Sequence, residues 1–187
     1  MHIEYNATTD KATPVNLTSH CYFNLSGNKE ENIFNHDLQI NAPFFLETND
    51  ALIPTGKSGA TKNTKKDFTT PQNLGELINQ NQEYDNCWVL NKQEDDIVKA
   101  ATLLHKKSGR MVTVCTTSPG LQFYSGNFLD GTLKNTKNAK QYNKYAGLCL
   151  EAQHFPDSPN NKHFSNTILE PGNVYHQKTI YSFHQST

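Results

Sequence analysis

The sequence predicts a mainly β protein built from antiparallel strands, and three observations lead to this prediction. Apolar and polar residues alternate in several short segments, which is the period of a strand with one buried face. Two runs of β-forming residues flank a Lys-Lys-Ser-Gly turn, which is typical of a hairpin. Helical periodicity is confined to one short segment. Strands that follow one another through turns, with little helix between them, favour antiparallel pairing.

The half-buried strands that we expect lie near both ends of the chain. Apolar and polar residues alternate over residues 3–7 and again over residues 38–42. Near the C-terminus three aromatic residues share one parity and three polar residues share the other: Tyr175, Tyr181 and Phe183 against His176, Lys178 and Ser182. Such alternation places one set of side chains on each face of a sheet, so each segment is expected to be a strand.

The hairpin is expected between residues 98–105 and 111–117, where Lys106 to Gly109 separate two β-rich runs. Pro171 and Gly172 form a turn signal just before the last strand.

A single helix is expected soon after Thr70. Thr70 and Pro71 resemble an N-cap and a first-turn proline. Leu74, Leu77 and Ile78 then supply one short apolar face. We therefore predict a short amphipathic helix over these residues.

Length and composition favour one lean globular domain. The chain has 187 residues, which is within the usual size of one domain. Its mean hydropathy is -0.72, but only 19% of residues are charged, which argues against the charge-rich class of disordered proteins. The Gly/Lys/Thr-rich residues 53–67 and the polar residues 135–144 are expected to be loops.

Charge and cysteine spacing exclude several classes of function. The formal net charge is -1, so a nucleic-acid partner is not expected. Arg110 is the only arginine, which disfavours a phosphorylated substrate. The four cysteines, Cys21, Cys87, Cys115 and Cys149, form no CxxC pair, so we expect reduced thiols and no metal site. No apolar run is long enough to span a membrane, and a membrane partner is not expected.

Three ionisable residues stand beside aromatic or apolar sequence, and each has an ordinary structural alternative. His20 follows an alternating strand and suits a general acid, or it is a core histidine. Asp85 lies between Tyr84 and Trp88, where a carboxylate could bind hydroxyls beside an aromatic wall; otherwise it caps a turn. Glu151 closes an apolar run, where burial would raise its pKa toward base chemistry, or it reaches the solvated rim.

Six ordered segments together resemble the aldose 1-epimerase (galactose mutarotase) family. They are TPVNLTSHCYFNL, DALIPTG, KDFTTPQNLGELI, YDNCWVLN, PGLQFYSGNFLDG and LCLEAQHFPDSPN. The resemblance extends from about Asp10 to the last strand. It implies a galactose mutarotase-like antiparallel β-sandwich (a supersandwich) with little helix, present here only in part.

The resemblance also implies roles for four residues. His20 matches the acid that protonates the ring oxygen, and Glu151 matches the base that removes the anomeric hydroxyl proton. Asp85 matches the aspartate that binds sugar hydroxyls, and Gln122 occupies the position of a further sugar contact. The implied activity is interconversion of the α and β anomers of a free hexose, galactose or glucose, with neither metal nor other cofactor.

Two positions in these segments depart from the family pattern. Ser19 replaces the commoner asparagine before the acid, and Asn86 replaces the usual histidine after the aspartate. The replacement at Asn86 leaves the neighbouring contacts there open.

Family members are roughly twice this length, and their N-terminal half supplies an arginine and a second histidine to the sugar site. Neither Arg110 nor His2 matches them. We expect residues 1–187 to be a single partial domain with the N-terminal half absent: a truncated product, a mis-started reading frame, one product of a split gene or a naturally short relative. Open strand edges would favour self-association or pairing with an N-terminal half.

Three functions therefore stay open on sequence grounds. The first is a cytoplasmic aldose 1-epimerase, and the second is a truncated, non-catalytic sugar-binding module of the same fold. The third, an epimerase of hexose phosphates, is disfavoured by the single arginine.

Overall fold

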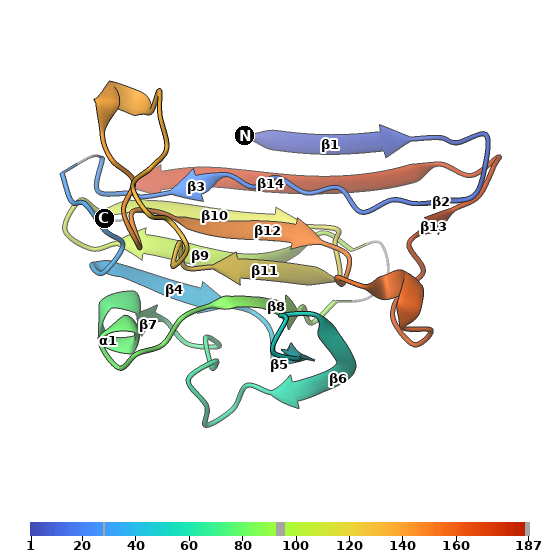
Figure 1. The fold of residues 1–187 in the computed structure, drawn as a ribbon, viewed down its shortest axis with the longest axis horizontal. Helices are drawn as coiled ribbons and strands as arrows, with labels where there is room; N and C mark the ends of the chain where they lie inside the picture. Colours follow the sequence, from blue (N-terminus) through green and yellow to red (C-terminus); the bar gives the residue numbers. More distant parts are fainter. Residues whose placement is uncertain (28, 93–95, 186–187) are drawn as a thin grey trace.

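The computed structural model describes residues 1–27, 29–92 and 96–185. Two six-stranded antiparallel sheets and a two-stranded ribbon make up the β structure of these residues (Figure 1). The first sheet has the order β1 (His2–Ala7), β14 (Tyr175–Gln185), β10 (Arg110–Thr116), β9 (Val98–His105), β4 (His36–Ile40) and β7 (Gln72–Asn73). The prediction of a mainly antiparallel β protein is confirmed.

The second sheet carries the residues of functional interest. Its order is β3 (Tyr22–Phe23), β12 (Leu148–Gln153), β11 (Gly120–Tyr124), β8 (Asp85–Val89), β5 (Phe44–Thr48) and β6 (Pro54–Ala60). The ribbon pairs β2 (Thr13–Pro14) with β13 (Ile168–Leu169). The remaining elements are the helix α1 (Leu74–Ile78) and two 3-10 turns, η1 (Lys137–Ala139) and η2 (Ser158–Asn160).

The core lies between the two sheets and is continuous across them. Val112 and Leu103 of the first sheet belong to the same buried cluster as Leu121 and Leu150 of the second. The hydroxyl of Tyr181, in β14, donates a hydrogen bond to the carbonyl of Leu150, in β12, at 2.9 Å. This bond satisfies a buried phenol and ties the sheets together.

An aromatic cluster fills the core beneath β8 and β11. The ring of Phe68 meets the rings of Tyr84, Trp88 and Phe123 edge-on, with centroids 5.3, 5.6 and 5.6 Å away. The Tyr84 hydroxyl and the Trp88 indole nitrogen donate to the carbonyls of Lys65 and Lys66. The cluster therefore anchors the segment before β7 to the underside of the second sheet.

Several predicted elements agree with the structure. Residues 2–7 form β1 with the expected alternation of half-buried and exposed residues. Residues 98–105 form β9, and β10 begins at Arg110, one residue before the predicted start. Residues 135–144 contain no strand, only the short turn η1.

Two predictions about local structure are wrong. The helix begins after Asn73, whose side-chain oxygen accepts a hydrogen bond from the Glu76 amide at 3.1 Å; Thr70 and Pro71 are not its cap because the chain first forms β7. Residues 54–60, predicted as loop, form β6 along β5. Gly59 fits there because a Cβ at that position would come within 2.8 Å of the Phe45 ring. This close approach produces no apolar alternation in the sequence.

Among the described residues no helix is long and apolar enough to cross a membrane.

A buried histidine ties the segment before β4 to the core. His36 is fully buried; its Nε2 accepts a hydrogen bond from the Leu25 amide at 2.8 Å, and its Nδ1 lies 3.1 Å from the Ile33 carbonyl. Since Nε2 accepts and Nδ1 donates, the ring is neutral. Burial, with a smaller contribution from His105, lowers the pKa of His36 from 6.5 to about 4.

This burial predicts a loss of stability in mild acid. The unfolded chain takes up a proton at His36 near pH 6.5, whereas the folded chain resists it down to about pH 4. The full stability is therefore present above pH 6.5, and about 3 kcal/mol is lost as the pH falls from 6.5 to 4. Urea unfolding at pH 7 and pH 5 measures the slope of the unfolding free energy against pH. His36→Gln is expected to reduce this slope. His184→Gln, at an exposed position, is expected to leave the slope unchanged; equal slopes in both variants would contradict the assignment.

Candidate functional site

The residues that the sequence singled out gather on the outer face of the second sheet, opposite the core. Gln122 of β11 is the register partner of Glu151 in β12. Two residues further along β11, Tyr124 is the partner of Asp85 in β8. Residues two apart on a strand share a face, so three strands direct these side chains to one side of the sheet. His20 reaches the same face from the segment between β2 and β3.

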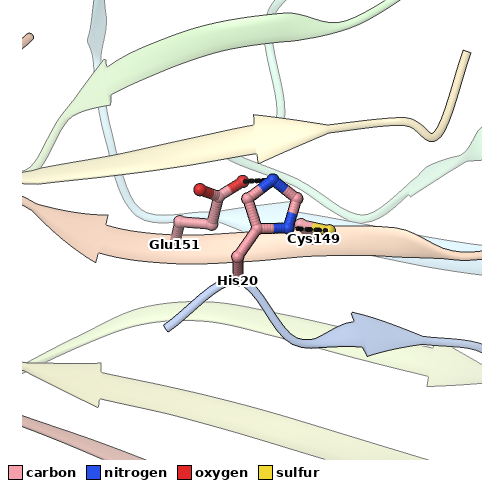
Figure 2. Close-up of side chains that lie close together, drawn as sticks. All are labelled: His20, Cys149 and Glu151. Atoms are coloured by element: carbon pink, nitrogen blue, oxygen red, sulfur yellow. Dashed lines mark hydrogen bonds and ion pairs between the residues drawn. The ribbon is translucent and has the colours of Figure 1, made fainter. Parts of the chain in front are cut away.

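His20 and Glu151 face each other across a short gap (Figure 2). The His20 Nε2 lies 3.5 Å from the Glu151 Oε1. The Glu151 side chain is 9% exposed, whereas that of His20 is 53% exposed. A buried carboxylate therefore lies beside an imidazole that remains accessible from solvent.

The other nitrogen of the His20 ring contacts a thiol. The Cys149 Sγ lies 3.3 Å from the His20 Nδ1. Cys149 is two residues before Glu151 in β12 and is fully buried. Figure 2 shows the imidazole with the carboxylate at one nitrogen and the sulfur at the other. Two side chains of the same strand, β12, thus contact the two nitrogens of the imidazole.

Asp85 and Gln122 form the second polar pair of the site. The Gln122 Nε2 donates a hydrogen bond to the Asp85 Oδ1 at 2.7 Å. The Gln122 Oε1 is buried and has no hydrogen-bond partner among the described residues. A buried acceptor without a partner is unfavourable, so a ligand that brings a hydroxyl donor to this oxygen would gain from the contact.

The electrostatics of the site favour proton transfer at Glu151. Burial raises the pKa of Glu151; the nearby His20 partly opposes this shift, and the negative charge of Asp85 makes a smaller contribution that raises the pKa further. Burial, reinforced by Glu151, also raises the pKa of the Cys149 thiol, so the sulfur keeps its proton at neutral pH. A carboxylate of raised pKa beside an imidazole is an arrangement suited to general acid–base chemistry.

The aromatic wall predicted around Asp85 is wrong in its residues. Tyr84 and Trp88 lie on the core face because they have the opposite parity to Asp85 in β8. The aromatic rings on the site face are instead Tyr22 and Tyr124. Their centroids lie 5.1 and 6.2 Å from that of His20 and 6.2 Å from each other.

Sequence reasoning missed Cys149, Tyr22 and Tyr124, although a signal for each was present. Each stands two residues from a candidate site residue: Cys149 from Glu151, Tyr22 from His20 and Tyr124 from Gln122. In strands, that spacing places side chains on one face. For Cys149 and Tyr124 the parity of β12 and β11 would have identified them.

At the two departures from the family pattern, the side chains do not contact the proton-transfer pair. The hydroxyl of Ser19 is 3.1 Å from the Cys21 sulfur. Asn86 is buried and has the parity of the core-facing residues in β8.

Arg110 lies at the hairpin, where its guanidinium donates to the Leu25 carbonyl at 3.1 Å, so it does not reach the site.

A cavity adjoins the site on the side of β3. Its volume is about 540 Å³, and it lies between residues 22–24 and the polar segment around residue 140, which projects in orange beyond the sheets in Figure 1. Tyr22 lines this cavity and also belongs to the aromatic group beside His20. The cavity is not lined by His20, Asp85, Gln122 or Glu151, so it is a neighbour of the site and not the site itself.

Known proteins resemble the chain over almost its whole length. The family model described as aldose 1-epimerase matches residues 1–182. A galactose mutarotase from Mus musculus is 42% identical in an alignment of 186 positions that covers 97% of this chain and 53% of that protein. An aldose 1-epimerase from Escherichia coli (strain K12) is 36% identical and is covered over 54% of its length. The chain thus spans about half the length of these relatives.

Solved structures extend the comparison to the fold. A GalM/aldose epimerase homologue from C. elegans superposes on 100% of this chain with a TM-score of 0.89, at 28% identity and over 56% of its own length. A galactose 1-epimerase from Lactobacillus acidophilus gives a TM-score of 0.78 at 25% identity, with 53% of its length covered. The expected mutarotase-like β-sandwich is therefore confirmed for the described residues.

Proposed function

The chain belongs to the aldose 1-epimerase family, and on that premise we propose that it interconverts the α and β anomers of a free hexose, such as galactose or glucose, at the site of His20 and Glu151. The observation that carries the proposal is the 3.5 Å approach of the His20 Nε2 to the Glu151 Oε1, with burial raising the pKa of the carboxyl group. A proton donor and a proton acceptor are thereby placed side by side.

In this mechanism the two residues act on opposite ends of the bond that opens. Glu151 removes the proton of the C1 hydroxyl while His20 gives a proton to the ring oxygen O5, and the C1–O5 bond breaks to leave an open-chain aldehyde. Rotation about C1–C2 exposes the other face of the carbonyl. Ring closure then returns the O5 proton to His20 and the Glu151 proton to the new C1 hydroxyl, so no net proton is consumed.

Asp85 and Gln122 are proposed to hold the sugar hydroxyls. The Asp85 carboxylate accepts hydrogen bonds, and the unpartnered Gln122 Oε1 accepts another. Tyr22 and Tyr124 supply apolar surface beside them, which suits the C–H face of a pyranose. This combination favours an uncharged polyol over a phosphorylated one, because no arginine reaches the site.

We also propose that residues 1–187 form one partial domain, equivalent to the C-terminal part of the longer relatives, and that it acts in the cytoplasm. The alternative function is a non-catalytic sugar-binding module. The His20 side chain is 53% exposed, so in either function its ring is open to water. Self-association, or pairing with an N-terminal half, is the proposed means of covering His20.

Polarimetry on freshly dissolved α-galactose and α-glucose separates the two functions. Faster mutarotation than the buffer rate supports the enzyme, whereas saturable hexose binding without acceleration supports the module. Adding a separately expressed N-terminal half of a relative tests the pairing: activity that appears only in the mixture supports a split site.

The pH dependence of mutarotation is expected to be bell-shaped. Activity needs ionised Glu151, so it falls as the pH drops through the raised pKa of that carboxyl group; the acid limb is therefore displaced upward from that of an ordinary glutamate. The opposite limb follows because a proton donor must carry its proton while the acceptor does not. Initial polarimetric rates from pH 4 to 9, corrected for the buffer rate, give the profile. A flat profile would contradict the assigned donor and acceptor.

A further inference from the structure

We propose that His20, Cys149 and Glu151 together form a binding site for a borderline-soft divalent cation of the zinc class, and that the bound cation blocks the site. One sulfur, one nitrogen and one oxygen atom of these residues all lie within 4.8 Å of one another. Figure 2 shows the three side chains converging from β12 and from the His20 segment.

The geometry is close to that of a tetrahedral zinc site. Zinc binds thiolate sulfur at about 2.3 Å and imidazole nitrogen at about 2.0 Å, so the two ligand atoms stand about 3.5 Å apart in a tetrahedron. The Cys149 Sγ and the His20 Nδ1 are 3.3 Å apart. These two ligands therefore need little movement to hold a common ion between them, and the Cys149 thiol releases its proton to solvent as the ion binds.

Glu151 completes a set of three ligands. Cys149 and Glu151 are two residues apart on β12 and point to the same face, so the strand presents a sulfur and a carboxylate to one ion. Burial fixes both positions. The Glu151 carboxylate faces the other ring nitrogen, Nε2, at 3.5 Å, so a three-ligand site requires the exposed His20 ring to turn and bring Nδ1 toward both ligands. The mixed S, N and O donors select Zn²⁺ or Co²⁺ over Mg²⁺ and Ca²⁺, which prefer oxygen ligands alone.

The sequence did not predict this site because its ligands are not arranged in a local motif. His20 is more than a hundred residues from Cys149 in the chain, and no CxxC pair exists. The ion would not be a cofactor of the proposed reaction. It would occupy both the proton donor and the proton acceptor, and so it would inhibit any reaction that needs them.

The test measures binding directly, before any activity. Zn²⁺ is titrated into the full chain in competition with a chromophoric chelator, and Co²⁺ serves as the spectroscopic probe. We expect one equivalent of Zn²⁺ to bind with a dissociation constant in the micromolar range. The Co²⁺ form is expected to show a thiolate-to-cobalt charge-transfer band in the near ultraviolet. No Zn²⁺ binding up to about 1 mM, which corresponds to only about 4 kcal/mol of binding free energy, would overturn the proposal.

Three variants locate the ion. Cys149→Ser is expected to abolish the charge-transfer band and to weaken Zn²⁺ binding by at least about tenfold, the loss seen even for outer-shell partners of a metal. His20→Asn removes a ligand from an exposed position, so it tests the same site if the buried serine variant does not fold. Cys115→Ser, in β10 of the other sheet, is the matched thiol control and should keep both band and affinity. A band that survives in Cys149→Ser but disappears in Cys115→Ser would place the ion elsewhere.

The inhibitory part rests on the proposed function and is tested separately. If the chain accelerates mutarotation, Zn²⁺ should suppress the rate and excess chelator should restore it. Mutarotation without a cobalt–thiolate band would overturn the metal site and leave the enzyme. A band without mutarotation in chelator-treated protein would refute the enzyme and leave the metal site.

Discussion

Replacing Glu151 by glutamine is expected to lower kcat for mutarotation by about 10²–10⁴-fold, the usual contribution of a positioned base, while hexose affinity changes much less. Glutamine keeps the shape of the side chain and one carbonyl oxygen, but it cannot take the proton from the C1 hydroxyl. Because Glu151 is buried in β12, an amide of the same size also leaves the strand packing intact. Polarimetric kcat and a separate measurement of hexose binding, by calorimetry, check the two halves of this expectation.

Glu170→Gln is the matched control for this experiment. Glu170 is exposed in the turn before β14, so the same chemical change there should alter neither kcat nor hexose binding. If Glu151→Gln turned over hexose at the rate of the unaltered chain, the base would have to be another group. If it lost hexose binding altogether, Glu151 would act mainly as a hydroxyl acceptor.

The Cys149 thiol orients the His20 ring beside this base. Burial raises the pKa of the thiol, so the sulfur stays protonated and uncharged, 3.3 Å from the His20 Nδ1. The contact turns Nε2 toward Glu151, so the nitrogen that gives its proton to the sugar ring oxygen lies beside the base. One buried strand thus holds the base and also orients the acid.

Much of the site could be predicted because its residues stand next to local signals. His20 and Glu151 were recognised from their segments, and the sheet register brings Gln122 and Asp85 onto the same face as Glu151. Cys149 was missed because cysteine counts as apolar in a hydrophobic run. In β12 the residues Leu148, Cys149 and Leu150 are all fully buried, so hydropathy does not separate the two faces, and only the two-residue spacing from Glu151 places Cys149 on the site face.

The aromatic wall around Asp85 was misplaced for a different reason. Tyr84 and Trp88 are close to Asp85 in sequence, and proximity suggested one surface. In a strand, however, residues an odd number of positions apart point to opposite faces, so both rings belong to the core while the carboxylate faces outward. The strand β6 escaped prediction because Gly59 fits against β5 through backbone pairing and close packing, neither of which leaves a hydrophobic pattern.

Replacing Phe68 by alanine is expected to destabilise the fold by about 3–5 kcal/mol, the usual cost of removing a buried phenylalanine ring. Phe68 is fully buried and contacts three aromatic rings of the cluster beneath the second sheet. Tyr84 immediately precedes β8, Trp88 lies within β8, and Phe123 lies in β11. Urea unfolding followed by the fluorescence of Trp88, the only tryptophan, measures the loss where the cavity forms.

The same variant tests whether the core positions the site. Asp85 of β8 and Gln122 of β11 are joined by a 2.7 Å hydrogen bond, and both strands rest on the Phe68 cluster. Loosening the cluster should therefore raise KM for hexose more than it lowers kcat, because Glu151 and His20 belong to other segments. Phe183→Ala removes a ring that is 57% exposed and should cost within about 0.5 kcal/mol, with KM unchanged. Equal losses of stability in the two variants, or a Phe68→Ala chain with unaltered KM, would show that β8 and β11 hold their side chains without this cluster.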